Sequence, residues 1–522
     1  MAPRLTAILG LVAVIAGPAS GQEVPRSAIS WIPLERDANA AEAPTGPTVQ
    51  RSTITSEPLI GTRRDAVGLV PARALGLPPD IWGISSALRI SRMLDELNEN
   101  GVPATRGLLH RLLLVEAIPP RGSGRRAIVL NARIDALMRM GAVDEAEALG
   151  QRAGPPDDRL FERLFDIALL TGRADAACKM LAADATLSDD LSTRVFCAAR
   201  SGQWDTAAMT LGLGEALGAI APLRADHLRM FLDPDLFEDD TDLDLPEPMT
   251  ALDFALREAA GQSRPRADLP PAFLYRDIHG RAPVRDRALA AERLSREGDF
   301  PYPILFAAYR ARTPAASGSV WDRMAHVQTL DAVLGQGEAT EDILPALRYA
   351  YDALAEVDLT MPLALEYGAA LSRLIPPAEG DLTVAKVLML AAQPAPARDW
   401  LPDEAPYPHH VALLIAEGSD AYDTLPPAPA LPGDADRLAT AALEAFALPM
   451  EGQSLDPQEA RLEDLLRINR NGEAVLSALD LLGAGVEVDP GDLRAALRTL
   501  RGLGLEEDAR RIAVQTILLR LP

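Results

Sequence analysis

The segment Gly141-Ala-Val-Asp144-Glu-Ala146 recurs along the chain, and this recurrence decides the fold that we predict. Glycine tolerates the left-handed backbone that ends one helix, and the acid lies in the first turn of the next helix, where it complements the helix dipole. The alanine follows where two helices must approach closely. Equivalent segments contribute Gly172, Asp175 and Ala177, then Gly202, Asp205 and Ala207, and finally Gly504, Glu507 and Ala509.

The first three of these glycines follow one another at nearly equal intervals. The intervals agree with a period of about 30 to 34 residues and two helices per unit, which is typical of repeat solenoids. We therefore predict an all-α fold, an α-solenoid of stacked antiparallel helix pairs, in which Ala146, Ala177 and Ala207 occupy equivalent buried positions. The alternative is an irregular helical bundle in which the Gly-Asp turns coincide by chance.

Helical patterns fill the chain from about residue 85 onward. Each segment has apolar residues at helical spacing, an acidic or hydroxyl residue near its start, and Gly or Pro near its end. No stretch alternates between apolar and polar residues for long enough to predict a strand. The clearest helical segments are 86–98, 105–116, 157–170, 188–200, 285–297, 341–356, 381–392, 457–468 and 492–502.

The Gly-x-x-acid-x-Ala turn resembles the central turn of tetratricopeptide repeats (TPR). The resemblance covers mainly residues 125–217, plus one unit near the C-terminus, where Gly472 opens a helix one repeat length before Gly504. It implies a divergent TPR-like solenoid. The chain departs from the family where a small residue is usual, at Ile134, Phe165 and Val195.

The segment 1–21 has the layout of a cleaved secretory signal peptide. Residues 1–4 carry positive charge, residues 5–17 are apolar, and Ala19 and Gly21 place small residues before the expected new N-terminus, Gln22. An uncleaved membrane anchor is the alternative, but the apolar run is shorter than the ~20 residues that a span needs. We therefore expect a periplasmic or secreted protein.

Residues 22–83 contain too many prolines for long helices, which predicts an extended proline-rich arm. Residues 38–48 have few large apolar side chains and indicate a flexible linker. The strip from Val67 to Trp82 is apolar and should pack on the helical body, or alternatively serve as a docking motif for a partner. This strip also resembles uncharacterised exported bacterial proteins, a likeness that implies no activity.

Proline-rich or acidic breaks at 233–248, 394–408 and 425–433 divide the helical region. These breaks complete the predicted domain organisation. It comprises a signal peptide (1–21), the arm (22–83), N-terminal TPR-like repeats (84–248), a central helical region (249–433) and C-terminal helical repeats (434–522).

The chain of 522 residues has 75 acidic and 51 basic residues, a formal net charge of −24. Binding to nucleic acid or to an anionic membrane generally needs a basic patch, so the charge argues against both partners. The sequence has no P-loop, no Gly-x-Ser-x-Gly and no His-Glu-x-x-His. We predict no catalytic, cofactor-binding or metal-binding residues, and we interpret the acidic loop 233–244 as solvated, because it lacks EF-hand register.

Cys178 and Cys197 are the only cysteines in the chain, and we predict that they form a disulfide. An even cysteine count in an exported protein favours pairing, because the periplasm is oxidising. The two cysteines lie on successive predicted helices at comparable distances from a turn near Thr186, which places them at similar heights. Two buried free thiols are the alternative.

These features predict a non-enzymatic exported scaffold whose concave solenoid surface binds a protein or peptide partner in the cell envelope. One alternative is a structural component of an envelope assembly, anchored by the arm. Another is an enzyme on a helical scaffold that acts on envelope polysaccharide, which would need a carboxylate pair and aromatic platforms. The available aromatic residues are Trp204, Trp321, Trp400, Tyr302 and Tyr407.

Overall fold

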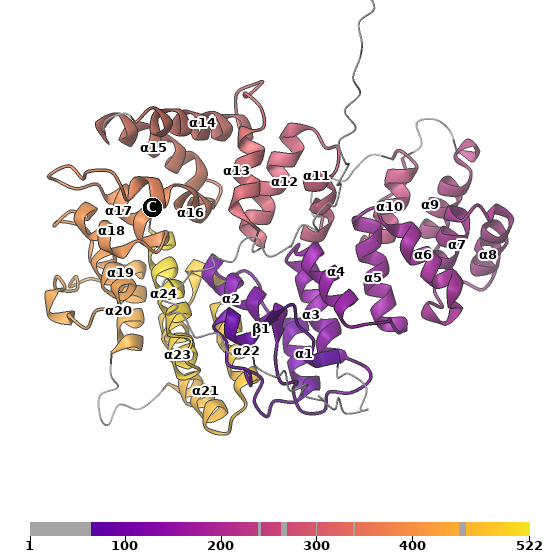
Figure 1. Cartoon of the computed structure of the whole chain (residues 1–522), viewed down its shortest axis with the longest axis horizontal. Coiled ribbons are helices and arrows are strands. Elements are labelled where there is room, and N and C mark those ends of the chain that lie inside the picture. The colour runs from indigo at the N-terminus through magenta and orange to yellow at the C-terminus, as the bar shows by residue number, and fades with distance from the viewer. Residues whose placement is uncertain are drawn as a thin grey trace, which may run out of the picture. The chain divides into compact units, whose positions relative to one another are not determined.

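The computed structural model describes residues 64–237, 242–262, 269–298, 300–337, 340–447 and 456–521. The predicted signal peptide and the linker 38–48 lie outside these residues. Within them the chain forms 24 α-helices, several short 3-10 turns and one pair of two-residue strands (Figure 1). The all-α prediction is confirmed.

The helices run in chain order as follows. The first ten are α1 (Ala87–Glu96), α2 (Pro103–Leu114), α3 (Ile128–Arg139), α4 (Val143–Arg152), α5 (Asp158–Leu170), α6 (Ala174–Ala183), α7 (Leu191–Arg200), α8 (Trp204–Ala216), α9 (Pro222–Leu232) and α10 (Ala251–Ala259). The next seven are α11 (Tyr275–His279), α12 (Val284–Glu297), α13 (Tyr302–Arg310), α14 (Val320–Gln336), α15 (Thr340–Ala355), α16 (Thr360–Leu371) and α17 (Leu382–Leu390). The last seven are α18 (Pro394–Trp400), α19 (Tyr407–Glu417), α20 (Asp434–Phe446), α21 (Pro457–Arg467), α22 (Asn471–Leu481), α23 (Pro490–Gly502) and α24 (Glu506–Arg520).

Many helices begin at a polar capping residue. The side chains of Ser86, Asp157, Asp190 and Asp381 each accept a hydrogen bond from a backbone N–H in the first turn of α1, α5, α7 and α17. Such caps satisfy N–H groups that have no acceptor within the helix.

Proline also starts helices in this chain, and this makes one prediction wrong. Residues 394–408 were expected to break the helical region, but Pro394 begins α18 and Pro408 lies in the first turn of α19. Proline is tolerated there because the first N–H groups of a helix lack intrahelical acceptors anyway.

Most consecutive helices pack on one another, and several also contact the helix two places further along. Such contacts join α1 with α3, α3 with α5, α7 with α9, α12 with α14, α17 with α19, and α21 with α23. Helix contacts also cross the predicted boundaries at 248 and 433, since α10 packs on α5 and α24 packs on α17 and α19. Among the described residues, no helix is long and apolar enough to span a membrane.

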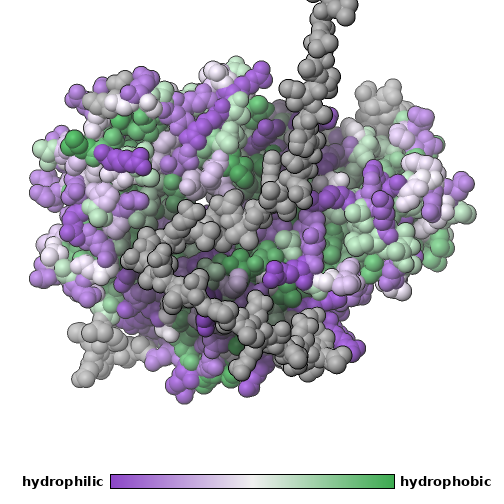
Figure 2. All heavy atoms as spheres, in the orientation of Figure 1, coloured by the Kyte–Doolittle hydropathy of each residue, from purple (hydrophilic) through white to green (hydrophobic). Residues whose placement is uncertain are grey.

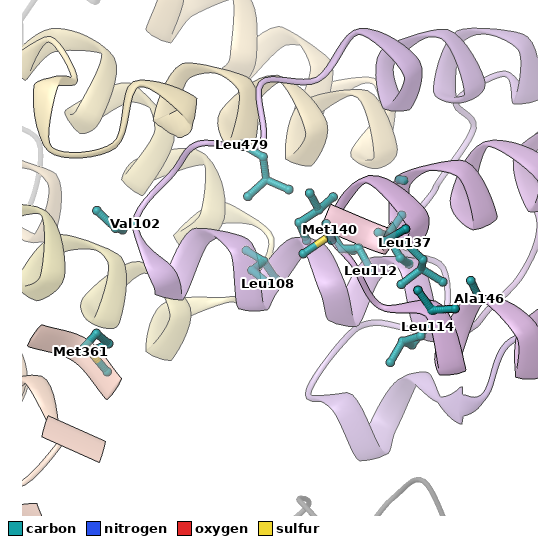
Figure 3. Close-up of a cluster of buried hydrophobic side chains, with 14 of the residues drawn as sticks. Val102, Leu108, Leu112, Leu114, Leu137, Met140, Ala146, Met361 and Leu479 are labelled. Carbon is teal, nitrogen blue, oxygen red and sulfur yellow. The ribbon is translucent and has the colours of Figure 1, made fainter. Parts of the chain in front are cut away.

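The first helices also meet the last ones. Helix α1 contacts α22, and α2 contacts α24, as Figure 1 shows. Part of the core beside α2 appears in Figure 3, where Leu108 and Leu112 lie near Leu137 and Met140. All four side chains are almost fully buried. Neighbour contacts alone therefore do not describe the packing of these helices.

The described end of the arm packs on the helices, as its apolar residues predicted. It contains two 3-10 turns, η1 (Arg64–Ala66) and η2 (Ala72–Leu75), and the strand β1 (Val70–Pro71). Strand β1 pairs in parallel with β2 (Val115–Glu116), a pairing too short to leave an alternating sequence pattern. Further along, Ile81 and Trp82 are buried.

Candidate functional site

The four predicted repeat turns have one geometry. Gly141, Gly172, Gly202 and Gly504 have φ values of 77°, 74°, 77° and 78°, all left-handed. At each turn the N–H of the next residue donates to the carbonyl five positions earlier, for example from Ala142 to Leu137 at 2.9 Å. This is the closing bond of a Schellman motif. The residues five places after the glycines, Ala146, Ala177, Ala207 and Ala509, are at most 1% exposed.

Three further turns combine this geometry with a buried residue five places later, and sequence reasoning missed them. Their left-handed residues are Asp358, Ala392 and Asn469, with φ values of 56°, 55° and 58°. The same closing bond is present at each, at 2.9, 2.8 and 2.8 Å. Five places later the chain buries Leu363, Ala397 and Ala474 completely.

Asn469, rather than Gly472, is therefore the turn residue of the unit near the C-terminus. Positions 358 and 392, like positions 469 and 504, are about one repeat length apart, so a search for spacing instead of glycine could have found them. Gly472 has another reason to be glycine: a Cβ there would lie 2.9 Å from the Trp82 ring.

The acidic residues of the repeat turns lie on the surface and play different local roles. Asp144 accepts a hydrogen bond of 2.8 Å from the Tyr275 hydroxyl, which ties α4 to α11. Asp175 pairs with Arg200 at 2.7 Å, and Glu507 pairs with Arg511 at 3.1 Å. Asp205 is exposed in the first turn of α8. None of these acids belongs to a shared site.

Cys178 on α6 and Cys197 on α7 lie at disulfide distance. Their sulfur atoms are 2.00 Å apart and their Cα atoms 5.0 Å apart. Both side chains are buried, at 3% and 6% exposure. The pair links the helices on either side of the turn that follows α6.

The aromatic residues considered for a polysaccharide site do not come together as platforms. They lie on α8, α13, α14, α18 and α19, and Trp400 is 1% exposed, so it cannot stack on a ligand at the surface. His409 lies in the first turn of α19, where burial lowers its pKa to about 4. Burial thus keeps this imidazole neutral at pH 7.

A group of carboxylates on three successively packed helices is the candidate site. We call Asp95 of α1, Asp135 of α3, and Glu162 and Asp166 of α5 the acidic stripe. Asp135 pairs with Arg163 at 2.5 Å, and the nearby Arg139 pairs with Glu99 at 2.6 Å. Among the described residues, no group of three or more His, Cys, Asp or Glu side chains is placed to hold a metal ion.

Within the acidic stripe, the pKa values of Asp95 and Asp166 are raised. Desolvation is the main cause of the raised pKa of Asp95, followed by the charge of Asp135. The Asp166 side chain is accessible to solvent, but protein atoms crowd its carboxylate. This desolvation, with the charges of Glu162 and Asp135, raises its pKa to about 7. A cationic group placed here would relieve this repulsion.

Helix α8 presents a second exposed surface. Met209, Leu213 and Leu217 are 69%, 53% and 67% exposed on or just after this helix, on the side opposite its buried Ala207 and Leu211. Figure 1 places α8 at the right-hand edge of the view, and Figure 2 shows hydrophobic residues there. Its apolar character differs from the charge of the acidic stripe.

No family model, curated protein or solved structure matches the chain.

Proposed function

We propose that this protein is an exported helical-repeat scaffold, without enzymatic activity of its own, that binds a basic segment of a protein partner in the cell envelope. The acidic stripe is the proposed contact surface. The observation that carries the proposal is the clustering of Asp95, Asp135 and Asp166 on three successive helices with raised pKa for the outer two.

Charge complementarity supports a basic partner. Lysine and arginine side chains of a partner would relieve the mutual repulsion of these carboxylates and would be attracted by the net charge of −24. Such electrostatic contacts favour fast association and specificity more than high affinity. An extended basic segment could contact α1, α3 and α5 in turn.

The arrangement of repeats that we propose is a divergent TPR-like solenoid of antiparallel helix pairs. Its support comes from seven turns of one geometry, each followed by a buried residue at the fifth position. Contacts between next-but-one helices are consistent with stacked pairs. The contacts of α1 and α2 with the last helices are an addition to the repeat pattern.

The proposed location is the periplasm or the extracellular space. It rests on the signal-peptide layout of residues 1–21 and on a cysteine pair at disulfide distance, which suits an oxidising compartment.

Affinity capture from the periplasm with a double variant tests the proposed contact. D135N together with D166N should weaken capture of a basic partner, and raised salt should weaken capture by the unaltered protein, because both reduce the attraction. The matched control is D189N with E341Q, which removes two exposed carboxylates elsewhere. Capture that is insensitive to both D135N/D166N and salt, or that is lost equally in the control, contradicts the proposal.

A further inference from the structure

A pocket of about 410 Å³ lies where distant parts of the chain meet. Its walls come from residues 100–103 before and within α2, from the end of α12, and from the turn between α15 and α16. The other walls come from α17, from residues 484–486 before α23, and from the end of α24. This volume lies within the roughly 300–1,000 Å³ range of small-molecule sites. Two other pockets, of about 150 and 100 Å³, are much smaller.

Two donors face this pocket without protein partners. The guanidinium of Arg296 and the hydroxyl of Thr360 line it, and neither makes a hydrogen bond or ion pair with a described residue. Thr360 as a whole is only 7% exposed. A ligand that supplies an acceptor would give both groups a hydrogen-bond partner in the protein's pocket in place of water.

Backbone N–H groups at the start of α16 lie beside the Thr360 hydroxyl in the pocket lining. Thr360 is the first residue of α16, a helix of 12 residues whose N-cap, Leu359, provides no side-chain acceptor. The first N–H groups of a helix and its dipole attract anions. The second helical residue, Met361, also lines the pocket.

The charge of the lining is opposite to that of the whole protein. Arg106, Arg296 and Lys386 line the pocket with a single carboxylate, that of the exposed Asp358. Lys386 donates a hydrogen bond of 2.8 Å to the Leu521 carbonyl, and its ammonium lies 5.4 Å from the centre of the Tyr351 ring. Arg106 already donates to the Gly298 carbonyl at 3.0 Å and to the Gly101 carbonyl, so Arg296 is the lining cation that points to an anionic ligand.

The remaining walls are apolar. Val102, Met361, Leu519 and Leu521 line the pocket, and Figure 3 shows that Val102 and Met361 come from separate segments. We propose that the pocket binds an organic carboxylate with an apolar chain. Arg296, Thr360 and the N-terminus of α16 hold the carboxylate, and the apolar walls contact the chain. The ligand is either a free organic acid or the C-terminus of a peptide that ends in an apolar residue.

Calorimetry and thermal unfolding of the purified protein test this site. Octanoate is the probe for a free organic acid, and a tetrapeptide ending in leucine is the probe for a peptide C-terminus. Octanol and the C-terminally amidated tetrapeptide are the matched controls without a carboxylate charge. At least one carboxylate probe should bind and raise the thermal midpoint, and its uncharged partner should bind about tenfold more weakly. The tighter of the two carboxylates identifies the source.

Variants separate this site from general binding to apolar surfaces. R296Q should lower the affinity for the carboxylate probe that binds by about tenfold, and T360V should lower that affinity by a smaller factor. R293Q is the matched control: it removes the same charge from α12, but Arg293 pairs with Glu297 at 2.8 Å and does not line the pocket. Failure of both carboxylates to bind, equal binding of the uncharged probes, or equal losses in R296Q and R293Q overturns the proposal.

Discussion

The buried side chain of Arg133 joins three separate segments of the chain through hydrogen bonds. It is 1% exposed, and its guanidinium donates to the carbonyls of Leu113, Val67 and Val115 at 2.7, 2.7 and 2.8 Å. Burial lowers its pKa to about 10, and the charge of Asp65 opposes that change, so the group stays cationic at pH 7. Asp65 in turn accepts hydrogen bonds from the first N–H groups of α3 at 3.1 and 2.9 Å. These two residues fix the arm to α2 and α3.

We expect R133M to lower the free energy of unfolding by about 3–5 kcal/mol, because three buried carbonyls lose their donor. Urea unfolding followed by circular dichroism measures the change. Arg159 is exposed on α5, so R159M serves as the control and should stay within about 0.5 kcal/mol of the unaltered protein. A similar small effect of R133M would show that the three carbonyls find other donors.

Asp166 gives a pH prediction. Its pKa is raised from 3.8 to about 7 on folding, so the native state binds more protons between these values. Its contribution to stability is therefore fully present below pH 3.8 and is lost as the pH rises through about 7. The thermal midpoint of D166N, relative to that of the unaltered protein, should be higher at pH 8 than at pH 5. A difference that is constant with pH contradicts the raised pKa.

A left-handed turn followed by a buried residue at the fifth position recurs along the described chain. Four turns could be predicted because glycine is the residue that adopts the left-handed conformation without strain. Asp358, Ala392 and Asn469 were missed because they are not glycine, and only their spacing indicates a turn. Asp and Asn adopt the left-handed conformation more readily than alanine, in which the Cβ makes it unfavourable. The prolines of α18 predicted a break where a helix is present. Proline disrupts the interior of a helix but is well tolerated in its first turn.

Strain at the turn of Ala392 can be tested by removing its Cβ. A392G should stabilise the protein by about 0.5–1 kcal/mol, because it removes the strained Cβ of a left-handed residue. The control A395G lies on an exposed position of α18 and should destabilise by a similar amount, because glycine is unfavourable within a helix. Urea unfolding of both variants gives the two signs, and a destabilising A392G would argue against strain at this turn.

Contacts between the arm and α22 hold the two ends of the described chain together. Trp82 is 1% exposed, and its carbonyl accepts from the Gly472 N–H at 3.3 Å. Next to it, the Ile84 N–H donates to the Asn469 carbonyl at 2.7 Å. The apolar residues of the arm predicted burial, but no local pattern identified α22 as the partner or placed a pocket between distant segments of the chain.

W82A should lower the stability of the whole molecule by about 3–5 kcal/mol and open the contact between α1 and α22. Hydrogen exchange should increase in both helices, with a lower thermal midpoint. Trp204 is 53% exposed, so W204A is the control and should change neither quantity appreciably. Unchanged exchange in α22 after W82A would mean that the remaining contacts suffice to hold the ends.

The hydrogen bond from the Glu473 N–H to the Ser85 hydroxyl spans 388 residues of sequence, and this separation sets an order of events during synthesis. At about 5–20 residues per second, a ribosome takes roughly 20–80 s to make the intervening chain. Throughout that interval Trp82 has been made, but α22, whose Gly472 packs against it, has not. The nascent chain therefore exposes an apolar strip until its C-terminal helices have been synthesised. A chaperone that binds such a strip would have most effect on the yield of folded protein during this period.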